Sequence, residues 1–343
     1  MYDIVRQFAE QLSHEEKVRL LRDLKAAIAE ELSPEKGEPE ACPRCGCPEF
    51  TKKGHARGGA QRWLCKGCGS TFQASTRGLL AASKLGPAVW MEFAECMADC
   101  LSLRDSAERC HVALSTAWFM RHRVCEVMEG RLGTFRPCSR CQVDGTYFAE
   151  NLSGNHARSS TFEMPRKPHK NGKGVRKRGI SNEQVCVLTG INEFGDVFAG
   201  LSCRGRETIE DVKAALAGRV GAGSAVETDM HPSYPRAMAA LGVASHVTVD
   251  PKDRSAGDIN MVNAMHSRLD GFLSGFHGVA TRRLQHYLDW FCYREQFKGC
   301  DGDRREILYS HEAEGSYTTT RREYALTPHP FMEYWGQVNS GLT

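Results

Sequence analysis

Two aspartates and one asparagine have the residue types and the spacing of a metal-dependent phosphoryl-transfer site. Asp144 and Asp229 stand at the ends of predicted strands, and Asn263 follows Asp229 by 34 residues on a predicted amphipathic helix. Their oxygen atoms suit Mg²⁺ or Mn²⁺, and two such ions can activate a water or a 3′-hydroxyl and stabilise the leaving oxygen of an in-line displacement. The sequence therefore predicts that these three residues hold a catalytic metal, although a lone aspartate at a strand end is more often a turn residue or a helix cap.

The helix that carries Asn263 is predicted to have a polar stripe beside an apolar face. At 100° per residue, the apolar residues of the segment 259–275 share one face, and Asn263, His266 and Asp270 cluster next to it. His266 is therefore a candidate for catalytic support. Asp270 lies two turns beyond Asn263, about 10 Å along the axis, and cannot readily replace it at the same metal pair.

The elements that must position these residues begin near residue 141. Predicted strands cover 142–148, 184–188, 197–201, 225–228 and 246–249, and predicted helices cover 208–217, 259–275 and 281–297. Thr208 and Asp211 are predicted to cap the first of these helices. This order is typical of a ribonuclease-H-like α/β domain, a mixed sheet flanked by helices, which we expect over residues 136–300.

Four cysteines upstream have the spacing of a structural zinc site. They form two Cys-x-x-Cys pairs, with 19 residues between the pairs: Cys42, Cys45, Cys65 and Cys68. Four thiolates can complete a closed tetrahedral Zn²⁺ site, so we predict a zinc ribbon over residues 41–75. Cys47, a fifth cysteine nearby, is an alternative ligand.

Basic residues surround both predicted metal sites. Arg57, Arg62 and Trp63 lie between the two cysteine pairs, where they would suit a phosphate-facing surface or simply a solvated loop. Residues 166–178 hold seven Lys/Arg and no acid. We predict that this second stretch is a loop that grips DNA, through Lys170, Lys173, Arg176 and Lys177.

Residues 76–135 are predicted to be helical and to contain a helix-turn-helix-like segment. Ser102 and Asp105 form a capping box for a short helix, and Ser115 is predicted to cap a second one. The second helix would read DNA through Trp118, Arg121 and Arg123. His111 stands about where the turn glycine is usual, and a helical hairpin without a DNA-binding role stays open.

Composition places the chain among ordinary globular proteins with several domains. It has 343 residues, 41% hydrophobic and 25% charged, and a formal net charge of +3. Residues 1–40, a predicted helical region and linker, carry a net charge of −4, which leaves +7 for the rest. Neither a bilayer-spanning apolar run nor a signal peptide is present, so we expect a cytosolic protein without membrane contact whose 15 cysteines are reduced. Residues 301–343 are expected to form a C-terminal tail.

Several motifs in this order give the chain a family resemblance. They are Cys-Pro-Arg-Cys at 42–45, Trp63 before the pair at 65–68, Val-Asp-Gly-Thr-Tyr-Phe at 143–148, the segments 177–185 and 260–267, Thr228-Asp229, and Tyr-Leu-Asp-Trp-Phe at 287–291. Over nearly its whole length the chain resembles the zinc-ribbon DDE-type transposases of small bacterial insertion sequences, the ISXO-like group. The expected fold class is therefore multidomain α+β, with a zinc ribbon and a helix-turn-helix followed by a ribonuclease-H-like catalytic domain.

The resemblance implies roles for particular residues. Asp144 and Asp229 match the two metal-binding aspartates, and Asn263 matches the third position, where many such transposases have Glu and one branch has Asn. Several members of that branch carry Lys seven residues later, where this chain has Asp270. The implied reaction is cleavage at the ends of the element, followed by attack of the released 3′-hydroxyls on target DNA. It implies a homo-oligomer on double-stranded DNA in the bacterial cytoplasm, on the nucleoid.

Two other functions stay open at this stage. One is a catalytically inactive, transposase-derived DNA-binding regulator, which Asn263 and Asp270 would allow. The other is a structure-selective nuclease of the same fold, which the sequence-reading modules argue against.

Overall fold

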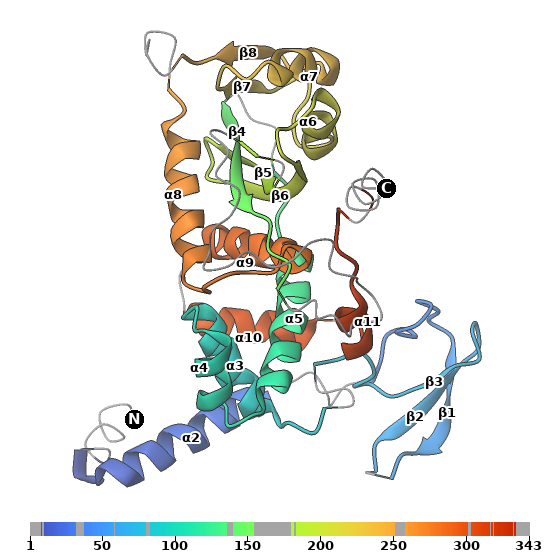
Figure 1. The fold of residues 1–343 in the computed structure, drawn as a ribbon. Helices are drawn as coiled ribbons and strands as arrows, with labels where there is room; N and C mark the ends of the chain where they lie inside the picture. Colours follow the sequence, from blue (N-terminus) through green and yellow to red (C-terminus); the bar gives the residue numbers. More distant parts are fainter. Residues whose placement is uncertain are drawn as a thin grey trace, which may run out of the picture. The chain divides into compact units, whose positions relative to one another are not determined.

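The computed structural model describes residues 8, 10–31, 38–57, 59–79, 83–135, 140–153, 180, 181, 183–250, 258–300, 303–315, 317, 319–331 and 333. They form two compact units, which we describe separately (Figure 1). The first unit combines Met1–Val127 with Asp301–Thr319, and the second combines Met128–Cys300 with Thr320–Thr343.

The cysteine pairs lie next to a small three-stranded antiparallel sheet of the first unit, one before β1 and one at the end of β2. Its strands, in spatial order, are β1 (Phe50–His55), β2 (Gln61–Cys65) and β3 (Thr71–Phe72). Trp63, expected on a phosphate-facing surface, is instead only 7% exposed and lies in a small apolar core. Phe50 packs edge-on against Trp63 and Phe72, with ring centroids 5.3 and 5.5 Å apart. In so small a module the tryptophan is needed for burial.

The rest of the first unit is helical. Its helices are α2 (His14–Glu31), α3 (Pro87–Ala98), α4 (Leu103–Arg109), the greater part of α5 (Leu114–Gly130) and α10 (Arg304–Glu314). The predicted N-cap at Ser102 is confirmed, because its hydroxyl accepts a hydrogen bond from the Asp105 backbone. The predicted cap at Ser115 is wrong, since α5 begins at Leu114. His111, in the turn between α4 and α5, has a φ of 51°, the left-handed conformation that glycine adopts most easily.

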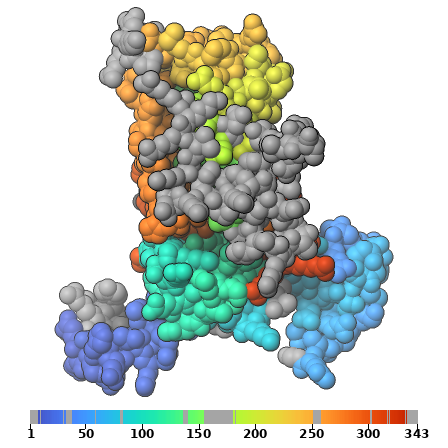
Figure 2. Space-filling model, viewed as in Figure 1, coloured from blue at the N-terminus to red at the C-terminus, as the bar shows by residue number. Residues whose placement is uncertain are grey.

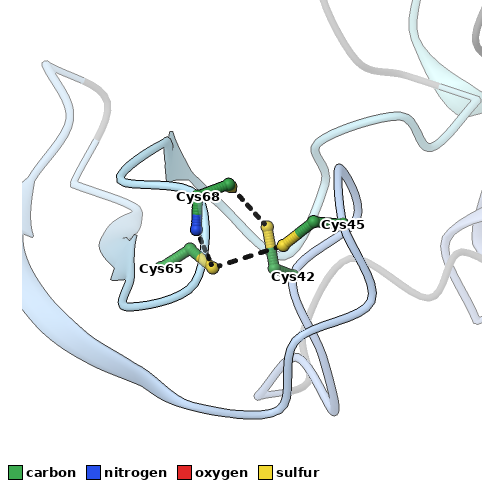
Figure 3. A group of neighbouring side chains, drawn as sticks. All are labelled: Cys42, Cys45, Cys65 and Cys68. Atoms are coloured by element: carbon green, nitrogen blue, oxygen red, sulfur yellow. Dashed lines mark hydrogen bonds between the residues drawn. The ribbon is translucent and has the colours of Figure 1, made fainter.

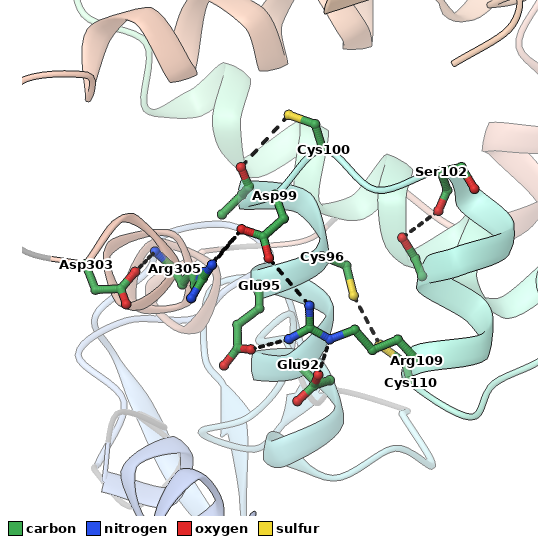
Figure 4. A network of polar contacts seen from close by, with 12 residues as sticks. Glu92, Glu95, Cys96, Asp99, Cys100, Ser102, Arg109, Cys110, Asp303 and Arg305 are labelled. Atoms are coloured by element: carbon green, nitrogen blue, oxygen red, sulfur yellow. Dashed lines mark hydrogen bonds and ion pairs between the residues drawn. The ribbon is translucent and has the colours of Figure 1, made fainter. Parts of the chain in front are cut away.

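An ion-pair network holds α3, α4 and α10 together (Figure 4). Arg109 donates to three carboxylates of α3 and of the residue that follows it: Glu92, Glu95 at 2.6 Å and Asp99 at 3.5 Å. Arg305 of α10 contacts the same Asp99 at 2.8 Å. Part of the expected C-terminal tail is therefore a helix of the first unit.

We predict that Arg109→Ala lowers the free energy of unfolding of the first unit by about 2 kcal/mol, because Glu95 is almost fully buried and loses a charged partner. Lys25, 2.8 Å from Glu95, limits the loss. Urea denaturation of the full chain measures the effect, with Arg104→Ala, an exposed arginine of the same helix, as the control. Equal stability of the two variants would show that the network contributes nothing.

The second unit is built on a mixed five-stranded sheet with the order β6-β5-β4-β7-β8. The strands are β4 (Cys141–Ala149), β5 (Gln184–Asn192), β6 (Val197–Arg204), β7 (Ala225–Thr228) and β8 (Ser245–Thr248). β4, β5 and β6 pair antiparallel, and β7 and β8 run parallel to β4. Each strand lies at or within one residue of its predicted start, and β4, β5 and β6 are longer than expected.

Helices cover both faces of this sheet. α6 (Ile209–Leu216) and α7 (Ser233–Leu241) pack on one face around a core that includes Val143, Leu188 and Tyr234. The neighbours of Val143 on β4 point to the opposite face, where α8 (Asn260–Ser274) lies. The capping box of Thr208 and Asp211 at the start of α6 is confirmed.

The remaining helices of the second unit are α9 (Leu284–Gln296), preceded by the 3₁₀ turn η3 (Thr281–Arg283), and α11 (Arg321–Leu326). Within the described part of the chain, no helix is both long and apolar enough to cross a bilayer.

Candidate active site

Asp144 lies where β4 loses its parallel neighbour. β7 pairs with β4 only at Cys141 and Gln142, so the β7 side of the strand is open from the next residue on. Asp144 is therefore the fourth residue of a nine-residue strand rather than its end. Its carboxylate accepts a hydrogen bond of 2.9 Å from the Gly145 backbone, and the hydroxyl of Thr189 on β5 donates to its carbonyl at 2.9 Å.

Asp229 directly follows β7 and comes close enough to Asp144 to affect its ionisation. Burial, followed by the negative charge of Asp229, raises the pKa of Asp144 to about 7, and the charge of Glu207 adds to the effect. Two carboxylates that repel each other in a half-buried place favour a cation between them. The donor set therefore fits a divalent metal.

A buried glutamine fixes α8 against β4. The Gln142 amide nitrogen donates to Glu227 at 2.7 Å and to the Asp258 carbonyl at 2.5 Å, and its carbonyl accepts from the Val262 backbone at 3.2 Å. Gln142 is fully buried. It therefore fixes the start of the helix that carries the third predicted ligand.

Among the described residues of α8, His266 is the one whose side chain contacts Asp144. Its Nε2 lies 2.7 Å from the Thr189 hydroxyl, and its Nδ1 lies 3.9 Å from Asp144 Oδ2. Asn263, one turn earlier, is exposed, and among the described residues its side chain has no hydrogen bond to either aspartate. Part of the surface of α8 is visible in orange in Figure 2. Asp270 is exposed two turns beyond Asn263.

Glu207 and His231 lie near the aspartates, but the sequence did not indicate either of them as a site residue. Glu207 is 5% exposed, accepts a hydrogen bond from the Tyr147 hydroxyl and lies 3.6 Å from Nδ1 of His231. The backbone N–H of His231 in turn donates to Asp229 at 2.9 Å. An acid just before a helix cap is typical of a helix-dipole partner, so no local pattern distinguishes Glu207.

The cysteine site matches its predicted ligand set (Figure 3). The sulfur atoms of Cys42, Cys45, Cys65 and Cys68 all lie within 4.8 Å of one another. Cys42 and Cys68 are 3.8 Å apart, and Cys45 and Cys65 are 3.5 Å apart. Thiolates about 2.3 Å from a tetrahedral zinc are about 3.8 Å apart, so zinc fits here. Cys47 contacts the Glu49 carbonyl instead and is outside this group.

No second group of this kind occurs in the parts of the chain that the structure describes: Asp144, Asp229 and His266 do not all lie within 4.8 Å of one another.

The predicted DNA-binding residues have different surroundings. Arg57 is exposed beyond the end of β1, and Arg62 is half-exposed on β2. The prediction for Arg121 requires correction: it is 2% exposed and donates to the Leu101 carbonyl at 2.7 Å, because α5 turns this side chain towards the turn before α4.

Two further predicted readers on α5 contact aromatic rings. Trp118 stacks edge-on with His122, and the Arg123 guanidinium lies over the rings of Phe119 and Tyr317 at 4.8 and 4.7 Å. The residues predicted to grip DNA in the basic loop, Lys170, Lys173, Arg176 and Lys177, lie outside the described residues.

The segment that holds the mixed sheet and both aspartates is similar to a known transposase domain. Residues 140–296 match the family model of the ISXO2-like transposase domain. The predicted resemblance to ISXO-like transposases is confirmed over this segment.

Among curated proteins, none matches the chain. Among solved structures, a pre-cleavage Mos1 transpososome is similar at 10% identity and a TM-score of 0.24, over 65% of this chain and 76% of that chain.

Proposed function

We propose that this protein is an insertion-sequence transposase that cleaves DNA at the ends of its element and joins the released 3′-hydroxyls to target DNA. The observation that carries the proposal is the pair Asp144 and Asp229, at the edge where β7 stops pairing with β4, close enough that the charge of Asp229 raises the pKa of Asp144. Both lie within a segment that matches a transposase family. The sheet order and its strand directions support a ribonuclease-H-like catalytic domain over residues 136–300.

Asp144, Asp229 and Asn263 would hold Mg²⁺ or Mn²⁺. When bound, such ions neutralise phosphate charge and lower the pKa of an attacking water or hydroxyl. Asp144 and Asp229 contribute the negative charge that attracts them. Thr189 orients the ring of His266 towards Asp144, and Gln142 fixes the helix from which Asn263 and His266 project.

DNA recognition is proposed for the first unit. A zinc ribbon over residues 41–75 would hold its hairpin rigid and present Arg57 and Arg62 to phosphates. α4, the turn at His111 and α5 have the order of a helix-turn-helix, and Trp118 and Arg123 are its remaining candidate readers. Two ends must be held together, so we propose a homo-oligomer on DNA in the cytoplasm.

Strand transfer tests this function. DNA from both flanks of the gene serves as donor ends, with a plasmid target and Mg²⁺ or Mn²⁺. Joined products are expected with either metal, and none with a chelator. Binding of the flanks without cutting or joining would favour the inactive DNA-binding regulator, and preferential cutting of RNA–DNA hybrids would favour a structure-selective nuclease.

We further predict that Gln142→Leu slows strand transfer about tenfold or more, because α8 loses its hydrogen bonds to β4 and its ligands move from their productive positions. Hydrogen exchange at the first backbone amides of α8 should become faster in parallel. Gln285→Leu is the control, because it removes a glutamine of α9 that makes similar hydrogen bonds to the backbone of β6. Unchanged exchange in α8 would contradict this role of Gln142.

A further inference from the structure

The hydrogen bonds of Thr189 determine which nitrogen of His266 carries the proton. The Thr189 hydroxyl lies 2.9 Å from the Asp144 carbonyl oxygen and 2.7 Å from His266 Nε2. A carbonyl oxygen can only accept, so the single hydroxyl proton is donated to Asp144. The Thr189 oxygen must then accept its second hydrogen bond from Nε2–H of His266.

Nδ1 of His266 consequently carries a lone pair. In a neutral imidazole only one ring nitrogen carries a proton, so the other is an acceptor. Nδ1 faces Asp144 Oδ2 at 3.9 Å, beyond hydrogen-bonding distance. The Nδ1 lone pair and a carboxylate oxygen therefore lie opposite each other in a half-buried place.

This arrangement is that of a metal-binding histidine. Such a histidine typically donates its other ring N–H to a neighbouring acceptor, which fixes the orientation of the ring. Metal–nitrogen and metal–oxygen bonds are each about 2.1 Å long, and together they exceed 3.9 Å, so one ion can contact both atoms without movement of the backbone.

We propose that His266 is a direct ligand, through Nδ1, of the divalent ion that Asp144 binds. This inference rests on the proposed function and adds a nitrogen ligand to a site expected to have only oxygen. A nitrogen ligand suits transition-metal ions better than Mg²⁺, so the site should prefer Mn²⁺.

Electron spin-echo envelope modulation of Mn²⁺ bound to the full-length, zinc-loaded protein tests the proposal without any measurement of activity. Wild type should show ¹⁴N coupling from a bound imidazole. His266→Gln should lose this coupling and bind Mn²⁺ about tenfold more weakly. His246→Gln is the matched control, because His246 also contacts a threonine hydroxyl, that of Thr228 at 2.9 Å, beside the second aspartate. It should keep the coupling.

Persistence of the ¹⁴N coupling in His266→Gln would overturn the proposal. It would also be overturned if wild type bound Mn²⁺ in a manner that requires Asp144 but showed no ¹⁴N coupling. In both cases the metal site itself would stand. If Asp144→Ala binds Mn²⁺ as wild type does, the proposed function fails as well.

Thr189→Ala provides a second variant that keeps the imidazole and removes its hydrogen-bond acceptor. It should keep the ¹⁴N coupling and bind Mn²⁺ several-fold more weakly. Unchanged Mn²⁺ affinity would contradict the role of Thr189 in orienting the ring, and with it the argument for Nδ1. This variant tests the proposal even if His266→Gln fails to fold.

Discussion

Asp144→Asn is expected to abolish strand transfer and, in the same protein, to stabilise the fold. Loss of one of two metal-binding carboxylates should lower the rate at least about a thousandfold, equivalent to about 4 kcal/mol of transition-state stabilisation. Asp229→Asn should lose activity to a similar extent. Strand transfer with gene-flank DNA measures both, and Asp270→Asn, an exposed acid of α8, should keep near-wild-type activity.

The stabilisation follows from the raised pKa of Asp144. In the folded state the Asp144 carboxyl group keeps its proton up to a pH of about 7, whereas in the unfolded chain it loses the proton near pH 3.8. Without divalent metal, the wild-type stability should therefore fall as the pH rises from about 4 to about 7. Asp144→Asn removes this loss, keeps an acceptor for the Gly145 N–H, and should be about 2 kcal/mol more stable at pH 8.

Thermal unfolding in a chelator that spares the zinc, measured from pH 5 to 8, tests the second half of this prediction. An Asp144→Asn protein that is both inactive and less stable than wild type at pH 8 would indicate that Asp144 is a structural residue. Full activity of Asp144→Asn or Asp229→Asn would remove that residue from the metal site.

Loss of the zinc site has the second-largest expected effect. Cys65→Ser should abolish zinc binding by the chain and unfold the β1–β3 module, because metal binding supplies most of the folding free energy of such a small domain. Specific binding to the ends of the element should weaken at least about tenfold, since Arg57 and Arg62 lose their rigid support. Zinc content and gel-shift affinity for flank DNA are the measurements.

Cys47→Ser is the matched control, because Cys47 lies beside the site but outside the group of four. It should retain zinc and end binding. If Cys65→Ser kept its zinc, or if Cys47→Ser lost it, the ligand assignment would be wrong. Metal-dependent nicking of non-specific DNA by Cys65→Ser should persist, because the catalytic residues belong to the other unit.

Features set by local interactions could be predicted from the sequence. The caps at Ser102 and Thr208 and the strand at 225–228 depend on residues only a few positions apart, and the structure confirms each of them. The cysteine group also followed from spacing, because each Cys-x-x-Cys pair forms its own turn.

Features that depend on packing between distant parts of the chain could not be predicted from the sequence. Arg121 has the sequence context of a DNA reader, and only the approach of the turn at Leu101 buries it. Contact between Thr189 and His266 requires the register of β5 on β4 and the docking of α8, which lie far apart in the chain. Likewise, Arg305 is brought to Asp99 only by the packing of α10 on α3.

Anomalous diffraction from crystals of the protein with end DNA and Mn²⁺ tests the central claim most directly. We predict a Mn²⁺ peak bound by both Asp144 and Asp229, with Nδ1 of His266 or the Asn263 carbonyl oxygen at bonding distance. At saturating Mn²⁺, the absence of a peak at these two aspartates would contradict the assignment of this site as the catalytic centre of a transposase.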